Sequence, residues 1–429
     1  MHTDALLNGL RDCSWRNKEG VLAYRPRHAV KAKDSKGNQT KYYVPNAAYD
    51  EYVAFRWEKG WLFYEDVIYL AMELLRLHPE IYNILKARYP YFFVDEFQDT
   101  LPQIVNFLQE LGNRGVVVGV VGDRCQTIYD FIGASVQQFD QFALPNIQEY
   151  SIFGNRRSTK EIVALLNTIR PNFSQYSVNN LSGSVPILFI GDKLTAFQQA
   201  TEYSNSDEVH SLSYKNIVAN SMKFKTEGAV DDDHLIDLDF DSDLKRSYYV
   251  KNLLKATEYA YYNDLREAYR MLDFLNSDRQ VTISYLRELL HNRKRFLCGT
   301  LYDFYIFLKD FLRINLKSIR GGKIKPFYET HTYVEMAMSV LQSDCDATHK
   351  TIHKAKGEEY KNVLIVLNDQ EDLEVLYNPD LDNKAAHRVY YVAMSRAEDN
   401  LFITVPAIDD EIKKKLASVP IRILELTDK

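Results

Sequence analysis

The chain has 429 residues, 46% of them hydrophobic, which is enough for two or three domains with sizeable cores. Its formal net charge of −6 excludes a globally basic protein. A polyanion site would therefore have to be local, for example in residues 25–41, 293–295 or 317–325, although a solvated loop or helix face is the ordinary interpretation of each. The four cysteines include no CxxC pair, which argues against a disulfide framework, a zinc ribbon or an iron–sulfur cluster. There is no signal-peptide pattern, and the longest apolar run, residues 116–122, is far shorter than the roughly 20 residues of a membrane span. We therefore expect a soluble, cytoplasmic protein with no membrane partner.

Residues 91–100, YFFVDEFQDT, run from apolar side chains straight into acids. This pattern is typical of a buried strand of a parallel sheet, and open α/β sheets bind their ligands at the carboxyl ends of such strands. Apolar residues then recur at helical spacing over 101–111, and a second buried strand over 116–121 closes on Gly122 and Asp123. A strand, a helix and a strand, each strand ending in an acid, predict a βαβ unit with a polar site at one rim.

The second half of the chain begins with another amphipathic helix, predicted at 160–170. Residues 175–335 are rich in helix patterns, and the acidic run 231–243 among them is typical of a solvated loop. The α/β pattern returns with strands at 362–368 and 401–405 around a helix at 385–399. We therefore predict an α/β protein of two parallel-sheet domains, with these boundaries: the first domain at 1–144, the second at 145–175 and 335–429, and a helix-rich insertion at 176–334 that lies outside the second sheet.

Asp95 and Glu96 suit nucleotide hydrolysis. One carboxylate can bind Mg²⁺ directly or through water while its neighbour polarises the attacking water, although such a pair alone could also merely cap a helix. The pair does not stand alone. Four further segments follow it in the chain: VVGDRCQTIYDFIGA (120–134), NRRSTKEI (155–162), THKTIHKAKGEEYKNVLIV (348–366) and HRVYYVAMSRAEDNLFIT (387–404).

These five segments, in this order, resemble motifs II to VI of superfamily 1 helicases of the UvrD/Rep/PcrA type. The resemblance covers roughly residues 60–170 and 340–405. It implies two RecA-like domains of the P-loop NTPase type, ATP and Mg²⁺ as cofactors, and single-stranded or partly duplex DNA as the partner. In such a protein ATP would bind between the two domains, whose closure steps the strand across their top.

The resemblance also implies a role for each matching residue. Asp95 would be the Mg²⁺ ligand, Glu96 the general base and Gln126 the γ-phosphate sensor. Arg157 and Arg396 would reach the γ-phosphate across the crevice between the domains, as arginine fingers do. Glu359 would contact the ribose. The remaining matches are the nucleotide-binding positions Arg156, Lys356, Gly357 and Arg388 and the DNA-binding positions Tyr129, Phe131, Thr351 and His353.

The sequence departs from the family pattern at several positions. Arg156 stands where an aromatic residue usually stacks on adenine, Ile132 where an arginine is usual, and Glu358 where leucine is typical. The largest departure is the P-loop, because residues 1–94 contain no G-x-x-x-x-G-K-[ST], the pattern whose amides and lysine cradle phosphates. We therefore expect the first motor domain to be N-terminally incomplete, through truncation or because the protein works without that segment.

The sequence thus predicts an ATP-dependent 3′→5′ DNA helicase or translocase of the UvrD type, inactive by itself for lack of its P-loop. A separate chain could supply the P-loop. The alternative is an ATPase-silent DNA-binding or assembly subunit of a nuclease–helicase complex, because the compact second half resembles the Gabija-type helicases of phage defence. DNA repair and phage defence both remain open. A third class, a nuclease using Asp95, Glu96 and Asp99, is disfavoured because the chain ends soon after residue 405.

Overall fold

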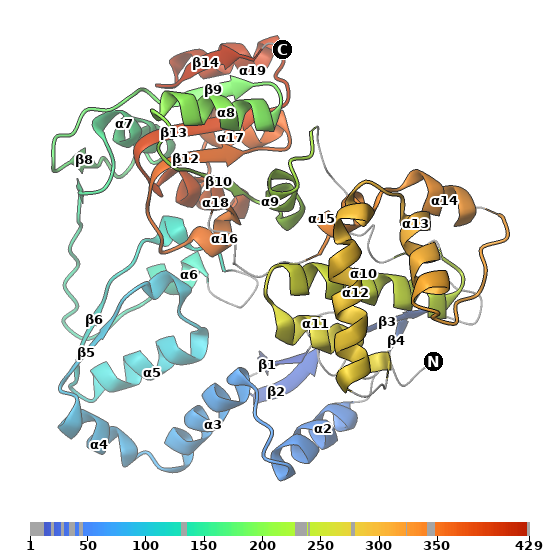
Figure 1. Cartoon of the computed structure of the whole chain (residues 1–429). Helices are drawn as coiled ribbons and strands as arrows, with labels where there is room; N and C mark the ends of the chain where they lie inside the picture. Colours follow the sequence, from blue (N-terminus) through green and yellow to red (C-terminus); the bar gives the residue numbers. More distant parts are fainter. Residues whose placement is uncertain are drawn as a thin grey trace. The chain divides into compact units, whose positions relative to one another are not determined.

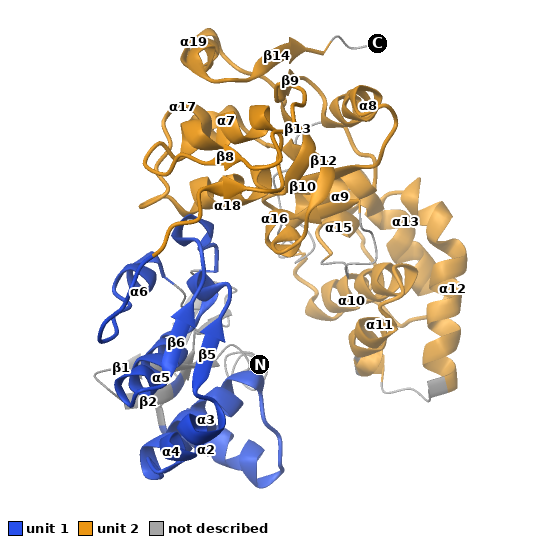
Figure 2. Cartoon of the chain, turned by 90° about the vertical axis from the view of Figure 1, so that its left-hand side faces the viewer, with its two compact units in different colours: residues 1–149 blue, residues 150–429 orange. Residues whose placement is uncertain are grey.

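The structure is a computed structural model in which the chain divides into two compact units, residues 1–149 and 150–429 (Figure 2). None of the helices within the described part of the chain is long and apolar enough to cross a bilayer. The described residues are 13–18, 21–26, 30–33, 39–42, 46–129, 135–227, 238, 241–275, 279–322, 324–340 and 348–426.

The first unit opens with two antiparallel strand pairs followed by three helices. The pairs are β1 (Cys13–Lys18) with β2 (Val21–Pro26) and β3 (Val30–Lys33) with β4 (Gln39–Tyr42); the helices are α2 (Asn46–Glu58), α3 (Tyr64–Leu77) and α4 (Ile81–Arg88). Arg56 and Asp66 form a buried ion pair of 2.6 Å between α2 and α3. The guanidinium also lies 4.1 Å from the centre of the Phe63 ring. Because both charges are buried and paired, this contact fixes the angle between the two helices.

The predicted βαβ unit is present. β5 (Tyr91–Val94) and β6 (Val117–Val120) pair in parallel, and α5 (Pro102–Asn113) connects them. Leu108 of α5 is fully buried and packs under one face of the strand pair, together with Phe97 and Phe142. A short helix, α6 (Val136–Asp140), follows.

The prediction that β5 and β6 are buried strands is wrong for one of their two faces. The Phe93 side chain is 73% exposed, and Tyr91, Val117 and Val121 are exposed beside it. The reason is that, within the described residues, the two strands form a sheet of their own and the helices cover one of its faces. A continuous apolar run does not by itself show how many strands share a sheet.

The second unit is built on a six-stranded parallel sheet with the strand order β11-β10-β12-β13-β9-β14 (Figure 1). The strands are β9 (Ile187–Ile190), β10 (Val209–Ser213), β11 (His349–Thr351), β12 (Tyr360–Val366), β13 (Ala397–Val405) and β14 (Arg422–Glu425). β12 and β13 are neighbours in one sheet, as the sequence predicted. β12 is buried except at Lys361, and β13 is buried at Ala397 and from Leu401 to Val405, as expected of a parallel sheet covered on both faces.

Helices cover the two faces of this sheet. On one face α8 (Lys193–Tyr203) and α9 (Asn216–Lys223) pack over Leu364, Val366 and Phe402. The second unit also contains the helices α7 (Lys160–Ile169), α16 (Ile352–Ala355), α17 (Glu374–Tyr377), α18 (Ala385–Met394) and α19 (Asp410–Lys415). A short parallel pair, β7 (Gly154–Asn155) with β8 (Tyr176–Ser177), flanks the start of α7.

The insertion is narrower than predicted. Residues 187–213 supply β9 and β10, with α8 between them, to the sheet itself, so the expectation that 176–334 lies outside the sheet is wrong for its first part. The helical insertion consists of α10 (Leu244–Tyr261), α11 (Leu265–Leu272), α12 (Arg279–Leu297), α13 (Leu301–Ile306), α14 (Ile324–Thr330) and α15 (Tyr333–Met338). β10 carries His210 and two serines, so it lacks the apolar pattern of 362–368 and 401–405. β9 is an apolar run of four residues, which is too short to identify a strand by its pattern alone.

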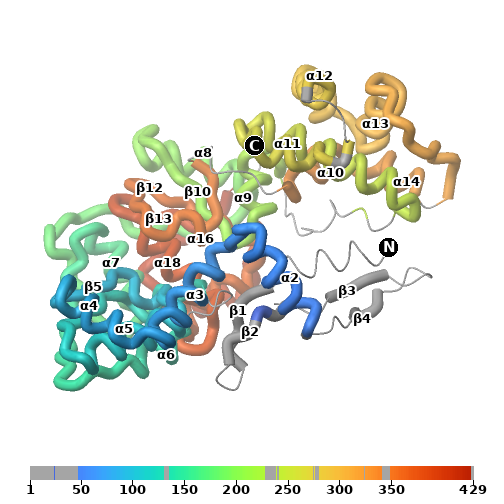
Figure 3. Tube along the Cα trace, turned by 90° about the horizontal axis from the view of Figure 1, so that it is seen from below, coloured from blue at the N-terminus to red at the C-terminus, as the bar shows by residue number. Residues whose placement is uncertain are grey.

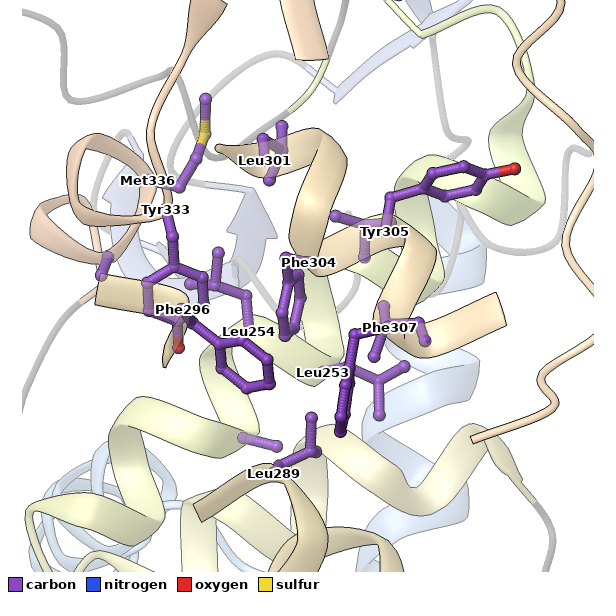
Figure 4. Close-up of a cluster of buried hydrophobic side chains, with 14 of the residues drawn as sticks. Leu253, Leu254, Leu289, Phe296, Leu301, Phe304, Tyr305, Phe307, Tyr333 and Met336 are labelled. Atoms are coloured by element: carbon purple, nitrogen blue, oxygen red, sulfur yellow. The ribbon is translucent and has the colours of Figure 1, made fainter. Parts of the chain in front are cut away.

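The insertion has its own core. The helices α10 to α14 of the insertion can be followed in Figure 3. Figure 4 shows aromatic rings from three helices converging there, with Phe296, Phe304 and Tyr333 at the centre. Phe296 meets the Phe304 ring edge-on at 5.0 Å and the Phe307 ring at 4.9 Å. The insertion is therefore a packed subdomain rather than a set of loops.

Two expectations about charged segments change in this subdomain. Arg293, suggested as part of a local polyanion site, is buried and paired with Glu258 at 2.7 Å, so it presents no charge to solvent. Asp241, suggested as part of a solvated acidic loop, is buried between Arg246 and the Tyr328 hydroxyl. Residues 231–237 and 239–240 of that run lie outside the described residues.

Candidate functional site

In the first unit, the polar residues of the predicted site follow the carboxyl ends of β5 and β6. Glu96 has a φ of +50°, the left-handed region that few residues other than glycine adopt. This turn carries the chain from the strand into the short helix Phe97–Asp99 and leaves Asp95 and Glu96 exposed. A strained turn at a strand end is typical of functional sites, where it presents a side chain to a ligand.

Gln98 joins the two strand ends. Its side chain is buried, its Nε2 donates to Glu96 Oε2 at 2.5 Å, and its Oε1 accepts from the backbone N–H of Asp123 at 3.0 Å. The Asp123 carboxylate in turn accepts from Gln126 Nε2 at 3.0 Å and from the Cys125 N–H. Glu96 and Gln126 are therefore held in one hydrogen-bonded network. No role was predicted for Gln98, although its place inside the DEFQD stretch is the signal that could have found it.

Tyr129 lies beside this network. Burial raises the pKa of its hydroxyl, and the charges of Asp99 and Glu96 raise that pKa further. Tyr129 is therefore close to the acids, so a ligand that contacts its ring would also lie near Glu96. Phe131 and Ile132 lie outside the described residues.

The carboxylates fit a Mg²⁺ ion only in part. Within the described residues, no cluster of three or more His, Cys, Asp or Glu side chains could hold a metal. Asp95 accepts a hydrogen bond from the Glu96 N–H at 2.9 Å, and both side chains are exposed. Mg²⁺ keeps several waters and is commonly bound by one or two carboxylates together with substrate phosphates. Asp95, with Glu96 beside it, fits that kind of shared coordination.

In the second unit, three of the predicted residues come together although they are far apart in sequence. Arg157 donates Nη1 to the carbonyl oxygen of Ser395 at 2.7 Å and forms an ion pair with Glu359 through Nη2. The hydrogen bond from Arg157 lowers the pKa of Glu359. The Asn155 side chain fixes the start of this loop by accepting from the N–H groups of Arg157 and Ser158.

Arg396 is the third of these predicted residues. It is only 4% exposed, and its guanidinium donates to Val392 O, Glu358 O and Ser395 Oγ at 3.2, 3.3 and 3.0 Å. Arg396 thus contacts Ser395, whose carbonyl oxygen accepts from Arg157, and Glu358, the chain neighbour of Glu359. As the structure stands, Arg396 supports the partners of Arg157, while Arg157, with 27% of its side chain exposed, is the more accessible arginine.

The other predicted nucleotide-binding residues are placed differently. Arg156 is exposed, whereas Arg388 is buried and donates to the carbonyl oxygens of Leu381 and Asp382 at 3.1 and 3.3 Å. Gly357 has a φ of +84°, which favours glycine there, and Lys356 directly precedes it. The contacts of Arg388 give it a role in holding the 381–382 loop.

The predicted DNA-binding residues of this unit lie at the carboxyl end of β11. Thr351 is buried at the start of α16, and the His353 ring stacks on Tyr214 with centroids 5.8 Å apart and planes 22° apart. Tyr214 follows β10, the neighbour of β11, and was not found by sequence reasoning.

A parallel sheet flanked by helices, with exposed acids at the strand ends of one unit and two neighbouring arginines in the other, agrees with the family resemblance of the sequence. The chain matches the "UvrD/REP helicase N-terminal domain" family over residues 17–145 and the "UvrD-like helicase C-terminal domain" family over residues 140–407. It therefore belongs to the UvrD-like helicase family.

Individual relatives agree with this assignment. The chain is 26% identical over 190 residues to the ATP-dependent DNA helicase PcrA of Leuconostoc citreum, covering 43% of this chain and 24% of that protein. It is 31% identical over 120 residues to PcrA of Bacillus subtilis (strain 168), covering 28% and 16%. It is also 26% identical over 107 residues to the Gabija protein GajB of Bacillus cereus (strain HuB5-5), covering 23% and 15%. These matches span less than a quarter of each relative's length.

Proposed function

We propose that the chain provides the ATP-hydrolysing and DNA-contacting residues of a 3′→5′ DNA helicase or translocase. The observation that carries the proposal is the Glu96–Gln98–Asp123–Gln126 network, since it holds a general-base candidate and a phosphate-sensing candidate together at the strand ends. Asp95 would bind Mg²⁺ and Glu96 would orient the attacking water, while Arg157 would neutralise charge on the γ-phosphate.

The roles of the two arginines differ in this proposal. Arg157 is accessible and already bound to an anion, the Glu359 carboxylate, so a phosphate oxygen could replace or join that partner. Three guanidinium N–H groups of Arg396 donate to oxygens of its own unit. Arg396 would therefore act by positioning Ser395 and the Glu358–Glu359 backbone around Arg157.

We further propose that the chain hydrolyses ATP only together with a P-loop, which residues 1–94 do not contain. Arginines can attract a triphosphate, but charge attraction alone does not fix the in-line geometry that carries much of catalysis. The P-loop could come from a fused segment or from a separate chain.

The test is phosphate release with and without single-stranded DNA, for the 429-residue chain alone and with a P-loop-bearing segment added. We expect negligible release by the chain alone and DNA-stimulated release with the segment, abolished by Glu96→Gln. Glu110→Gln on α5 is the matched control, because Glu110 is a partly exposed glutamate of the same unit paired only with nearby Arg114. Robust turnover by the isolated chain that Glu96→Gln abolishes would refute the P-loop requirement.

A second candidate function is an ATPase-silent DNA-binding or assembly subunit of a nuclease–helicase complex in phage defence. The similarity to the Gabija protein GajB and the missing P-loop pattern favour it. DNA binding without any hydrolysis, even after the P-loop segment is added, would select this candidate over the first. Co-purification with a nuclease subunit would support it independently.

A further inference from the structure

Glu359 is the anion that occupies Arg157 in this structure. In their ion pair, 27% of the Arg157 side chain and 49% of the Glu359 side chain remain exposed, so both can be reached from solvent. The hydrogen bond from Arg157 lowers the pKa of Glu359 against the opposing effect of burial, and the charges of Arg157 and Arg396 lower that pKa further. Glu359 is therefore ionised at neutral pH, and its carboxylate is stabilised by two guanidinium groups.

The backbone on both sides of Glu359 is held in place. Arg396 Nη1 donates to the carbonyl oxygen of Glu358 at 3.3 Å, and the N–H of Tyr360 donates to the carbonyl oxygen of Arg396 at 2.9 Å. The side chain of Glu358 is engaged elsewhere, because its Oε2 accepts from Lys350 Nζ at 2.7 Å and from the Tyr360 hydroxyl. Glu359 is thus held at a fixed place from which its side chain reaches Arg157.

Arg157 is held less completely than the backbone around its partner. Its Nη1 donates to the carbonyl oxygen of Ser395 and its Nη2 to Glu359, but its Nε is buried and has no hydrogen-bond acceptor within the described residues. A buried donor without an acceptor is costly, so another position of the guanidinium could satisfy more of its donors. A phosphate group offers several acceptor oxygens to one guanidinium. A polyphosphate can therefore compete with Glu359 for Arg157.

A carboxylate and a phosphate that share one guanidinium edge would repel each other. We propose that Glu359 is a resident competitor of the nucleotide: it holds Arg157 before a nucleotide binds, and a terminal phosphate reaches Arg157 only when this ion pair opens. The inference rests on the proposed function, which takes Arg157 as the arginine that meets phosphate. It adds a regulation of that same site, because the ion pair lowers the affinity of the chain for any polyphosphate.

The test is the binding of inorganic tripolyphosphate to the 429-residue chain, measured by isothermal titration calorimetry at neutral pH and physiological ionic strength. Glu359→Gln should tighten binding about two- to fivefold, which is the range that the loss of a partly exposed ion pair allows. Arg157→Gln should weaken binding. Glu359→Gln added to Arg157→Gln should change the affinity no more than a control substitution does, because the competitor then has nothing to hold.

Glu398→Gln is the matched control for the loss of one negative charge. Glu398 is a partly exposed glutamate in β13, and its carbonyl oxygen accepts from the N–H of Thr159, two residues after Arg157. Its substitution removes the same charge from the neighbourhood without removing the partner of Arg157. At physiological ionic strength, where exposed charges are screened, Glu398→Gln should bind tripolyphosphate nearly as the wild type does. Circular dichroism of every variant checks that the fold is kept.

ATP distinguishes this role from a ribose contact, which is the role that the family resemblance implies for Glu359. A ribose contact alone predicts that Glu359→Gln weakens the binding of ATP and leaves the binding of tripolyphosphate, which has no ribose, unchanged. That result would overturn the inference.

The outcomes also separate this inference from the proposed function. Equal tripolyphosphate affinities of Glu359→Gln and Glu398→Gln, a gain that persists without Arg157, or no binding by any variant would each overturn the inference alone. The failure of the helicase or translocase proposal is read from a different measurement, the absence of phosphate release after the P-loop segment is added.

Discussion

Removing Arg293 from the helical insertion should leave one of the most deeply buried charges of the chain without its main partner. Arg293 donates Nε and Nη2 to the two Glu258 oxygens at 3.0 and 2.7 Å, and the Tyr333 hydroxyl donates to Glu258 Oε1 at 2.7 Å. The Glu258 side chain is fully buried. Breaking a buried pair by removing one partner costs about 3–5 kcal/mol, so we expect Arg293→Ala to lower the free energy of unfolding by that amount at pH 7.

The reverse change should be costly for the same reason. Glu258→Gln leaves the Arg293 guanidinium in the core without a charged partner. The guanidinium keeps its proton, so its charge cannot be relieved by deprotonation.

The measurement is urea unfolding followed by far-ultraviolet circular dichroism, with amide hydrogen exchange in α10 and α12 as a local readout. Arg270→Ala is the matched control, because Arg270 pairs with Glu267 on the surface of α11 and should contribute less than about 1 kcal/mol. The three tryptophans, at positions 15, 57 and 61, all belong to the first unit, so their fluorescence transition should not move. The reasoning is refuted if Arg293→Ala costs no more than Arg270→Ala.

Three smaller predictions concern single residues. Glu359→Gln should change the free energy of unfolding by less than about 1 kcal/mol, because the Arg157–Glu359 ion pair is partly exposed. Since the pKa of Glu359 is lowered, the stability that the pair contributes is present above the unfolded carboxyl pKa and is lost as pH falls below it. Urea titrations at pH 7 and at acidic pH can check both expectations. Asp372→Asn should raise Tm at pH 7 and leave it unchanged at low pH, because burial raises the pKa of Asp372 and its charged form costs stability as pH rises; a lower Tm at pH 7 would contradict this. Gly122→Ala should lower the free energy of unfolding by about 1–3 kcal/mol, measured by tryptophan fluorescence, because the new Cβ would lie 2.4 Å from Gln98 Oε1. Gly119→Ala should cost less, because its Cβ would meet the exposed Phe93 ring, which can turn away.

The long elements with strong patterns could be predicted from the sequence. α5 was expected at 101–111 and spans Pro102–Asn113, with Val105, Leu108 and Leu111 buried at helical spacing. β12 and β13 were expected as neighbours from their apolar runs, and they are paired in register over most of β12. The family was recognisable because five short segments occur in a fixed order, which is information independent of packing.

β9 and β10 were not predicted from the sequence. β10 is buried at Ser211 and Ser213 because the neighbouring strands and α9 cover it, and no hydrophobic signal marks those serines. The exposed face of β5 was missed for the opposite reason. Phe93 has the residue type of a core position, but the described sheet contains no layer over its side. In both cases the burial depends on what other segments do, which local sequence does not record.

The same dependence on distant partners explains why Arg157 and Arg396 differ in their contacts and exposure, although the sequence predicted one role for both. Arg157 and Arg396 both occur in short motifs that imply contact with a γ-phosphate. Their surroundings in the second unit differ: Arg396 donates to three oxygens of its own neighbourhood, including Ser395 Oγ, while Arg157 reaches the Ser395 carbonyl and the Glu359 carboxylate. Releasing Arg396 toward a phosphate would break these contacts inside a nearly dry environment, where unsatisfied carbonyl groups are costly. Turning Arg157 toward a phosphate would exchange one partly exposed anion for another and give up its hydrogen bond to the Ser395 carbonyl. In the proposed function, Arg157 is therefore the arginine that meets the charge of the ligand, and Arg396 is the arginine that holds the residues around Arg157.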